Sequence, residues 1–166
     1  NTAGTCTASA QYSVTVNTTP TVAITSSNAT ICNGQNTALT LTGASTYTLL
    51  NDNTTITSGA SVSPTTTTTY SIQGSTGTCT SSATQQVITV NPLPAVTATT
   101  SAASICSGNT ATLTAAGANT YTWSGGPTSA TYTVNATNAY VVTGTDANNC
   151  VNTATVNLTV NPTPTV

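Results

Sequence analysis

The sequence predicts an all-β protein built from tandem repeats. Three observations support this prediction. Only 1% of the 166 residues are charged while 37% are hydrophobic, and Thr, Val, Ile and Tyr, which suit a half-buried pleated strand, are frequent. Apolar residues alternate with threonine in short runs, which is a period of two rather than 3.6. The chain also repeats itself, because three of its segments read SVTVNTTPTV (13–22), VITVNPLPAV (87–96) and NLTVNPTPTV (157–166).

The repeat can be followed through further landmarks. Alignment on Asn17, Asn91 and Asn161 gives steps of 74 and 70 residues. The tripeptide Cys-Asn-Gly that begins at Cys32 matches the Cys-Ser-Gly that begins at Cys106, and similar matches continue along both copies. The regular recurrence of these landmarks indicates that the same structural unit is used more than once.

These landmarks divide the chain into three predicted parts. Residues 1–20 are expected to be the C-terminal strand region of a preceding repeat. Residues 21–94 form one full repeat, and residues 95–166 form a second repeat with a C-terminal linker. The joints contain proline and are short and stiff, so we expect the repeats to follow one another in an extended arrangement.

Each repeat contains about six or seven short alternating runs separated by Gly and Asn clusters, which is typical of a β-sandwich of the Ig type. Leu39 and Leu41 alternate with threonines and are predicted to face the core. Trp123 is predicted to pack in the core, because Leu49 takes its place in the other repeat. The last strand of each repeat is expected to turn one apolar face inward. Its inward residues are predicted to be Val156, Leu158 and Val160, with Tyr12, Val14 and Val16 in the same places near the N-terminus.

Five cysteines in a nearly uncharged chain of exported character predict disulfides. The repeat symmetry favours the pairs Cys32–Cys79 and Cys106–Cys150, with one bond inside each repeat. Cys6 would then be unpaired within the chain, because its equivalent partner would precede residue 1. A free thiol or an intermolecular bond at Cys6 is the alternative. No metal site is expected, because the chain has no histidine and no Cys-x-x-Cys pair, in which two residues separate the cysteines.

The missing charges argue against whole classes of function. Without Lys or Arg nothing neutralises phosphate groups, so neither nucleic-acid binding nor attraction to anionic membranes is expected. No apolar run approaches the roughly 20 residues that span a bilayer, so membrane insertion is not expected. The chain has no His, Lys, Arg or Glu to activate a hydroxyl, which predicts a non-enzymatic protein without a cofactor. Asp52 and Asp146 are expected to form Asx turns rather than a calcium site.

One stretch carries a family resemblance. It reads CSGNTATLTAAGANTYTW from Cys106 to Trp123 and is followed by YVVTGTDANNC from Tyr140 to Cys150. This pattern resembles the Ig-like and PKD-like tandem repeats of giant secreted surface adhesins of the gliding-motility type, which are exported by the type IX route. The resemblance covers nearly the whole chain. It implies tandem Ig-like β-sandwich domains located outside the cell or on the outer surface of a bacterium.

The repeats and the absence of a reactive cluster predict a structural role. We expect a segment of an extracellular filament or adhesin stalk, whose partners are neighbouring repeats or copies of the same protein. Near-zero charge removes the repulsion that keeps proteins apart, which favours self-association into fibres. The alternative is an adhesive module that binds glycans or another surface through Tyr132, the one tyrosine without a counterpart in the other repeat. Ice binding by Thr-x-Thr pairs is a weaker alternative, because outward strand faces already explain these pairs.

Overall fold

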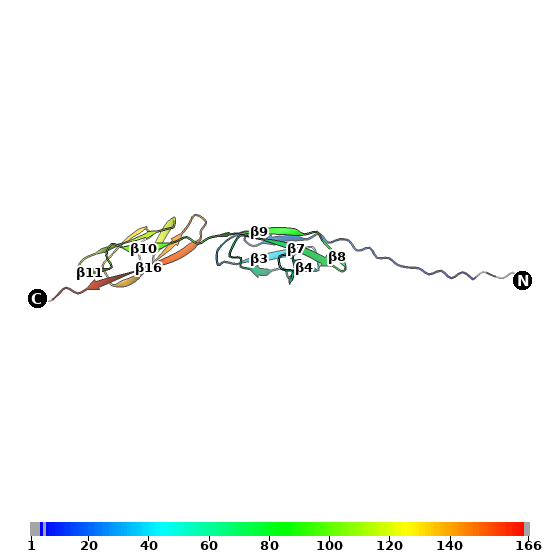
Figure 1. The fold of residues 1–166 in the computed structure, drawn as a ribbon, viewed down its shortest axis with the longest axis horizontal. Helices are drawn as coiled ribbons and strands as arrows, with labels where there is room; N and C mark the ends of the chain where they lie inside the picture. Colours follow the sequence, from blue (N-terminus) through cyan, green and yellow to red (C-terminus); the bar gives the residue numbers. More distant parts are fainter. Residues whose placement is uncertain (1–3, 5, 165–166) are drawn as a thin grey trace. The chain divides into compact units, whose positions relative to one another are not determined.

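The computed structural model describes residue 4 and residues 6–164, and the regular structure in this part of the chain consists of β-strands (Figure 1). The strands form four sheets. Two sheets are built from strands between residues 23 and 91, here called the first strand group. The other two are built from strands between residues 97 and 161, here called the second strand group. The all-β class predicted from the sequence is confirmed.

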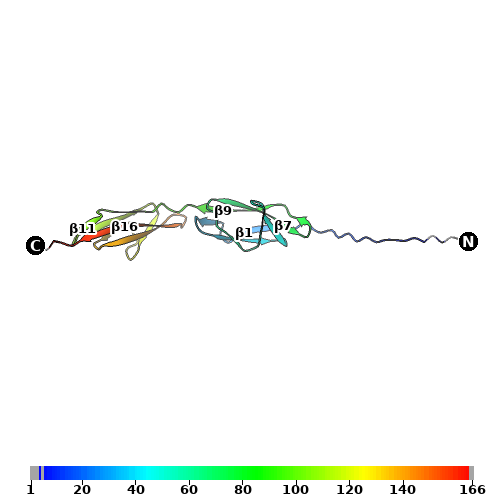
Figure 2. The ribbon, with the colours of Figure 1, turned by 60° about the horizontal axis from the view of Figure 1, so that its bottom comes forward.

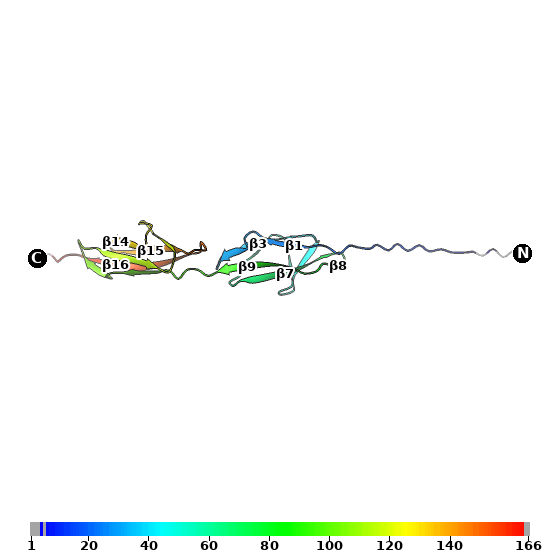
Figure 3. The ribbon, with the colours of Figure 1, turned by 90° about the horizontal axis from the view of Figure 1, so that it is seen from above.

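The first strand group contains nine strands in two sheets. One sheet has the order β1-β3-β6, and Figure 3 shows β1 beside β3. The other has the order β2-β9-β7-β4-β5, with the short β8 paired to β7. The bounds are β1 (Ala23–Ser26), β2 (Thr30–Cys32), β3 (Thr37–Thr42), β4 (Thr46–Leu49), β5 (Thr54–Ile56), β6 (Ala60–Val62), β7 (Thr68–Thr76), β8 (Cys79–Thr80) and β9 (Thr84–Asn91).

The second strand group repeats this plan with seven strands. Its sheets have the orders β10-β12-β14 and β11-β16-β15-β13, which match the first group strand for strand once β5 and β8 are left out. Seven strands in these two sheets correspond to an Ig-type sandwich, so the predicted Ig-like class is confirmed. The bounds are β10 (Thr97–Thr100), β11 (Ser104–Cys106), β12 (Ala111–Ala116), β13 (Thr120–Trp123), β14 (Thr131–Val134), β15 (Asn138–Thr145) and β16 (Val151–Asn161).

The core of the second strand group lies between its two sheets. Leu113 on β12 packs in one buried cluster with Trp123 on β13, Val142 on β15 and Leu158 on β16. Alternate residues of β12 are buried, as the period of two predicts. Trp123 is 1% exposed and its indole N–H donates to the Ser129 carbonyl at 3.1 Å, which satisfies its polar atom inside the core. The predicted packing role of Trp123 is confirmed.

The first strand group is buried in the same alternating manner. Leu39 and Leu41 on β3 are 0% and 3% exposed, as predicted. Tyr70 and Ile72 on β7 are also buried, and burial raises the pKa of the Tyr70 hydroxyl above its ordinary value of 10.0.

Each group contains one parallel strand pair. β2 runs parallel to the end of β9, with Cys32 in register with Asn91. β11 runs parallel to the end of β16, with Cys106 in register with Asn161, and Figure 2 shows these two strands together. Both cysteines therefore lie beside the C-terminal end of the last strand of their group.

The N-terminal segment differs from the prediction. Residues 6–22 of the described chain form no strand, although 13–22 match the end of β9 and of β16 in sequence (Figure 3). The predicted inward residues Tyr12, Val14 and Val16 are 92%, 83% and 86% exposed. A strand needs neighbours for its backbone N–H and C=O groups. β9 and β16 each lie between two other strands, whereas the described residues supply no such neighbours to this segment.

We predict that a side chain at Gly117 is excluded both by the backbone conformation and by neighbouring atoms, whereas at Gly108 only the backbone conformation disfavours one. Both have positive φ, at 91° and 92°, so alanine at either position costs about 1–2 kcal/mol in backbone strain. A Cβ at Gly117 would also collide with the Ala95 carbonyl, whereas a Cβ at Gly108 would meet nothing within 4 Å. Gly117→Ala should therefore lower the free energy of unfolding by about 1–3 kcal/mol more than Gly108→Ala in urea denaturation. Equal losses would contradict this.

We also predict that stability falls at alkaline pH because of Tyr70. Its pKa is raised in the folded state, so the unfolded chain releases this proton first. The contribution to the free energy of unfolding is complete below about pH 10 and is lost as pH rises from there toward the folded-state pKa. Urea denaturation between pH 8 and pH 11, with free thiols alkylated, should show a smaller decline for Tyr70→Phe. The matched change at the exposed Tyr12, Tyr12→Phe, should leave the decline unchanged.

Candidate functional site

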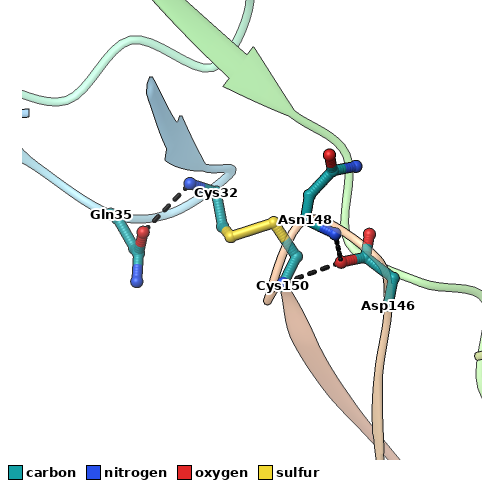
Figure 4. Close-up of a disulfide and its surroundings, with 5 residues drawn as sticks. All are labelled: Cys32, Gln35, Asp146, Asn148 and Cys150. Carbon is teal, nitrogen blue, oxygen red and sulfur yellow. Dashed lines mark hydrogen bonds between the residues drawn. A yellow bond between two sulfur atoms is a disulfide. The ribbon is translucent and has the colours of Figure 1, made fainter. Parts of the chain in front are cut away.

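One disulfide joins the two strand groups. It connects Cys32, the last residue of β2, with Cys150, which directly precedes β16 (Figure 4). The Cα atoms are 5.5 Å apart, and the two residues are separated by 118 positions in the sequence. Cys32 is 8% exposed and Cys150 is 0% exposed, so the bond is sheltered from solvent.

The predicted pairs Cys32–Cys79 and Cys106–Cys150 are therefore wrong. The parallel strand pairs explain why. Cys106 is aligned with Asn161 at the end of β16, whereas Cys150 precedes the start of this eleven-residue strand. At about 3.3 Å per residue the two cysteines lie roughly 35 Å apart, and a disulfide requires a Cα separation of about 4.4–6.8 Å. In the same way, Cys32 is aligned with the end of β9 and Cys79 precedes its start.

The other three cysteines are free thiols. Cys6 and Cys106 are exposed and Cys79 is half-buried. One bond thus connects the two groups, in place of the predicted bond inside each repeat.

The Cys32 side of the bond is held by a tight turn after β2. The Cys32 N–H donates to Oε1 of Gln35 at 2.9 Å, and the Gln35 N–H donates back to the Cys32 carbonyl at 3.0 Å. Gly34 occupies the turn with φ 88°, a backbone conformation that favours glycine. The Asn33 N–H donates to the Asn91 carbonyl at 2.9 Å, which ties the turn to the end of β9.

The Cys150 side is held by the carboxylate of Asp146. Its Oδ1 accepts hydrogen bonds from the backbone N–H groups of Asn148 and Cys150, both at 2.8 Å (Figure 4). This is the Asx turn predicted for Asp146, and Asp52 forms another with the N–H and hydroxyl of Thr54. The sequence predicts both the turn at Asp146 and a disulfide at Cys150, but it does not indicate that the turn reaches the Cys150 N–H.

Both bonded cysteines fall in one compact unit of the chain, which comprises residues 26–38, 61–69 and 87–166. A crosslink between residues 118 positions apart lowers the entropy of the unfolded chain by an amount worth about 5 kcal/mol in the chain-entropy treatment.

The compact unit that holds both bonded cysteines also contains an open, polar depression of about 450 Å³ close to the Cys32 turn. Its lining residues are Asn28, Thr30, Ile31, Gly34, Gln35, Asn36 and Ser63.

Tyr132, the predicted glycan contact, is half-buried on β14. Its ring packs edge-on against Tyr140, with centroids 5.9 Å apart, and lies 6.1 Å from the ring of Trp123 at a tilt of 50°. These contacts are those of a residue that closes the rim of the core. Glycan binding through Tyr132 stays a prediction.

Among residue 4 and residues 6–164, no group of three or more His, Cys, Asp or Glu side chains is placed to hold a metal ion. No helix long and apolar enough to cross a membrane occurs in the same part of the chain.

Comparison with known proteins identifies no family. No family model matches the chain, and no curated protein matches it either. Among solved structures, it is similar to the full Ig1–Ig3 ectodomain of mouse nectin-like molecule 4, with 15% identity, a TM-score of 0.38 and 89% of this chain covered. It is also similar to the adhesin InvE of Yersinia pseudotuberculosis, with 15% identity, a TM-score of 0.30 and 82% covered. The chain spans 65% of the first structure and 58% of the second.

We predict that Asp146 stabilises the protein through its two accepted hydrogen bonds. Asp146→Ala leaves the N–H groups of Asn148 and Cys150 without this acceptor and should lower the free energy of unfolding by about 1–3 kcal/mol. Asp146→Asn keeps an oxygen at the same position and should lose less than half as much. Urea denaturation of the oxidised protein measures both. A loss in Asp146→Asn as large as in Asp146→Ala would show that the charge matters rather than the turn.

Proposed function

We propose that this chain is a load-bearing segment of an extracellular stalk or filament on a bacterial surface. In this proposal residues 21–94 and 95–166 are two successive repeats, and residues 1–20 belong to the C-terminal strand region of a repeat before them. The repeated strand order of the two groups supports the division. A disulfide is typical of proteins outside the reducing cytosol and supports the location.

The Cys32–Cys150 bond is the observation that carries the proposal. A pull on the two ends of the chain passes from residue 32 to residue 150 through the sulfur atoms. The 117 residues between them, which include most of both cores, then lie outside the covalent path of the force. Such a bond limits how far the chain can lengthen under tension.

The parallel strand pairs fit the same role. In the second strand group, the Ser107 N–H donates to the Asn161 carbonyl at 2.8 Å and the Thr159 N–H donates to the Ala103 carbonyl at 3.0 Å. The chain enters this group at β10, passes into β11 and leaves the group at the end of β16. When the Cys32–Cys150 bond is reduced and the force reaches β11, a pull along these two parallel strands in opposite directions loads their hydrogen bonds together rather than one after another.

The surface agrees with contact between like repeats. With a net charge of −2 and no basic residue, neither repeat repels a copy of itself strongly. The outward residues of the strands are largely threonine, as on the exposed positions of β12. We therefore propose neighbouring repeats of the same kind as the main partners of this segment.

The proposal predicts a redox-dependent length under force. If the chain is stretched by its ends, the oxidised form should fall short of the reduced form by at most about 400 Å, because 118 residue steps of about 3.4 Å are withheld. Single-molecule force extension measures this difference.

Two variants serve as controls. Cys32→Ser combined with Cys150→Ser should extend equally in both redox states. Cys106→Ser should behave like the unchanged protein, because Cys106 is a free thiol in this chain. Unfolding of the oxidised chain to the same length as the reduced chain would contradict a load-bearing role for this bond.

A further inference from the structure

Two of the free thiols occupy the same structural positions as the two bonded ones. Cys106 is aligned with Asn161 on the parallel pair β11–β16, as Cys32 is aligned with Asn91 on β2–β9. The Ser107 N–H donates to the Asn161 carbonyl at 2.8 Å, and the Asn33 N–H donates to the equivalent Asn91 carbonyl at 2.9 Å. Cys106 therefore presents its exposed thiol as Cys32 would without its partner.

Cys79 is the counterpart of Cys150 in the first strand group. Cys79 follows β7 and Cys150 follows β15, in each case by a short turn, and Cys79 begins the two-residue strand β8. The Cys79 thiol lies 3.6 Å from the Asn17 carbonyl, to which it donates a hydrogen bond. Asn17 is the sequence equivalent of Asn91. Asn91 lies beside Cys32, the cysteine that is disulfide-bonded to Cys150. The thiol of Cys79 thus lies next to the place where the matching cysteine of an earlier repeat would lie.

We propose that Cys79 and Cys106 form the same bond with adjoining repeats. Cys106 pairs with the Cys79-type cysteine of a following repeat, and Cys79 pairs with the Cys106-type cysteine of a preceding one. The partner is another repeat of this kind, so the inference rests on the stalk proposed above. The step oxidises two thiols to one disulfide, and a small-molecule disulfide takes up the two electrons and the two protons and leaves as two thiols.

Repetition of this bond creates a continuous covalent route through an array. From Cys79 the route follows β9, the Pro-containing linker, β10 and β11 to Cys106, and then crosses to the next repeat. A second, interleaved route of the same kind begins with the Cys32–Cys150 bond seen here. Strands β3–β7 and β12–β15 belong to neither route, so most of each core would bear no covalent load.

A head-to-tail fusion of the chain tests the proposal. Residues 157–166 match residues 13–22, so Val166 can be joined directly to Ala23 of a second copy without changing the repeat register. The full chain is kept and is extended by residues 23–166. Cys6→Ser and Cys79→Ser in the first copy, together with Cys106→Ser in the second copy, remove the free thiols outside the new joint. Cys106 of the first copy and Cys79 of the second copy are then the two thiols that remain outside the Cys32–Cys150 bonds.

The fusion protein is refolded with oxidised glutathione, its free thiols are alkylated, and it is cleaved with chymotrypsin because trypsin has no Lys or Arg to recognise. We expect mass spectrometry to find the Cys106 peptide linked to the Cys79 peptide within one molecule, beside the Cys32–Cys150 bond of each copy. Cys79→Ser in the second copy removes the proposed partner of Cys106. The Cys106 thiol should then be alkylated, while the Cys32–Cys150 bonds stay intact.

Alkylated Cys106 and Cys79 beside intact Cys32–Cys150 bonds would overturn the proposal. Cys106–Cys79 links found only in disulfide-bonded dimers would also overturn it, and so would either cysteine bonded inside its own repeat. Thiol counting on the same fusion under native conditions gives a second readout, in which Cys106 should be unreactive only when the second Cys79 is present. The force experiment on the single chain depends on Cys32–Cys150 alone, so failure here would leave that result standing.

Discussion

The parallel pairing of a three-residue strand with the end of the last strand is the constraint on which this structure depends. It places Cys32 beside Asn91 and Cys106 beside Asn161, at the end of each strand group where the chain leaves it. The cysteine before the last strand is then a whole strand length away from the cysteine of its own group. A bond inside the group is therefore excluded, and each cysteine can pair only outside its own group. The bond between groups is therefore a result of strand direction.

Much of the fold was predictable because it depends on local patterns. Leu39 and Leu41 are buried where the alternation with threonine placed them, and Trp123 fills the core. The cysteine pairs were not predictable in the same way. The sequence symmetry showed which cysteines are equivalent, but β2 and β11 are too short for their pattern to show whether they run parallel or antiparallel to the last strand. Strand direction is a property of the assembled sheet, and the pairing depended on it.

The segment before residue 23 shows the same limit. Its alternating apolar face marks it as a last strand, yet Val14 is 83% exposed while Leu158, its counterpart, is 1% exposed. The local pattern specifies which face would turn inward. A sheet must still offer neighbouring strands before this face can be buried and the backbone groups can pair. The turn at Asp146 is likewise predictable from its local sequence, whereas the partner of the cysteine that this turn orients is not.

The separation of 118 residues between the bonded cysteines also affects how such a chain matures. Synthesis proceeds from the N-terminus, so Cys32 is made long before Cys150 exists. In the meantime Cys79 appears and can compete for oxidation. Folding of the first strand group removes this competitor, because it holds Cys79 and Cys32 at opposite ends of β9. Correct crosslinking is therefore favoured when each group folds before its cysteines are oxidised, which makes the timing of oxidation part of the assembly of the protein.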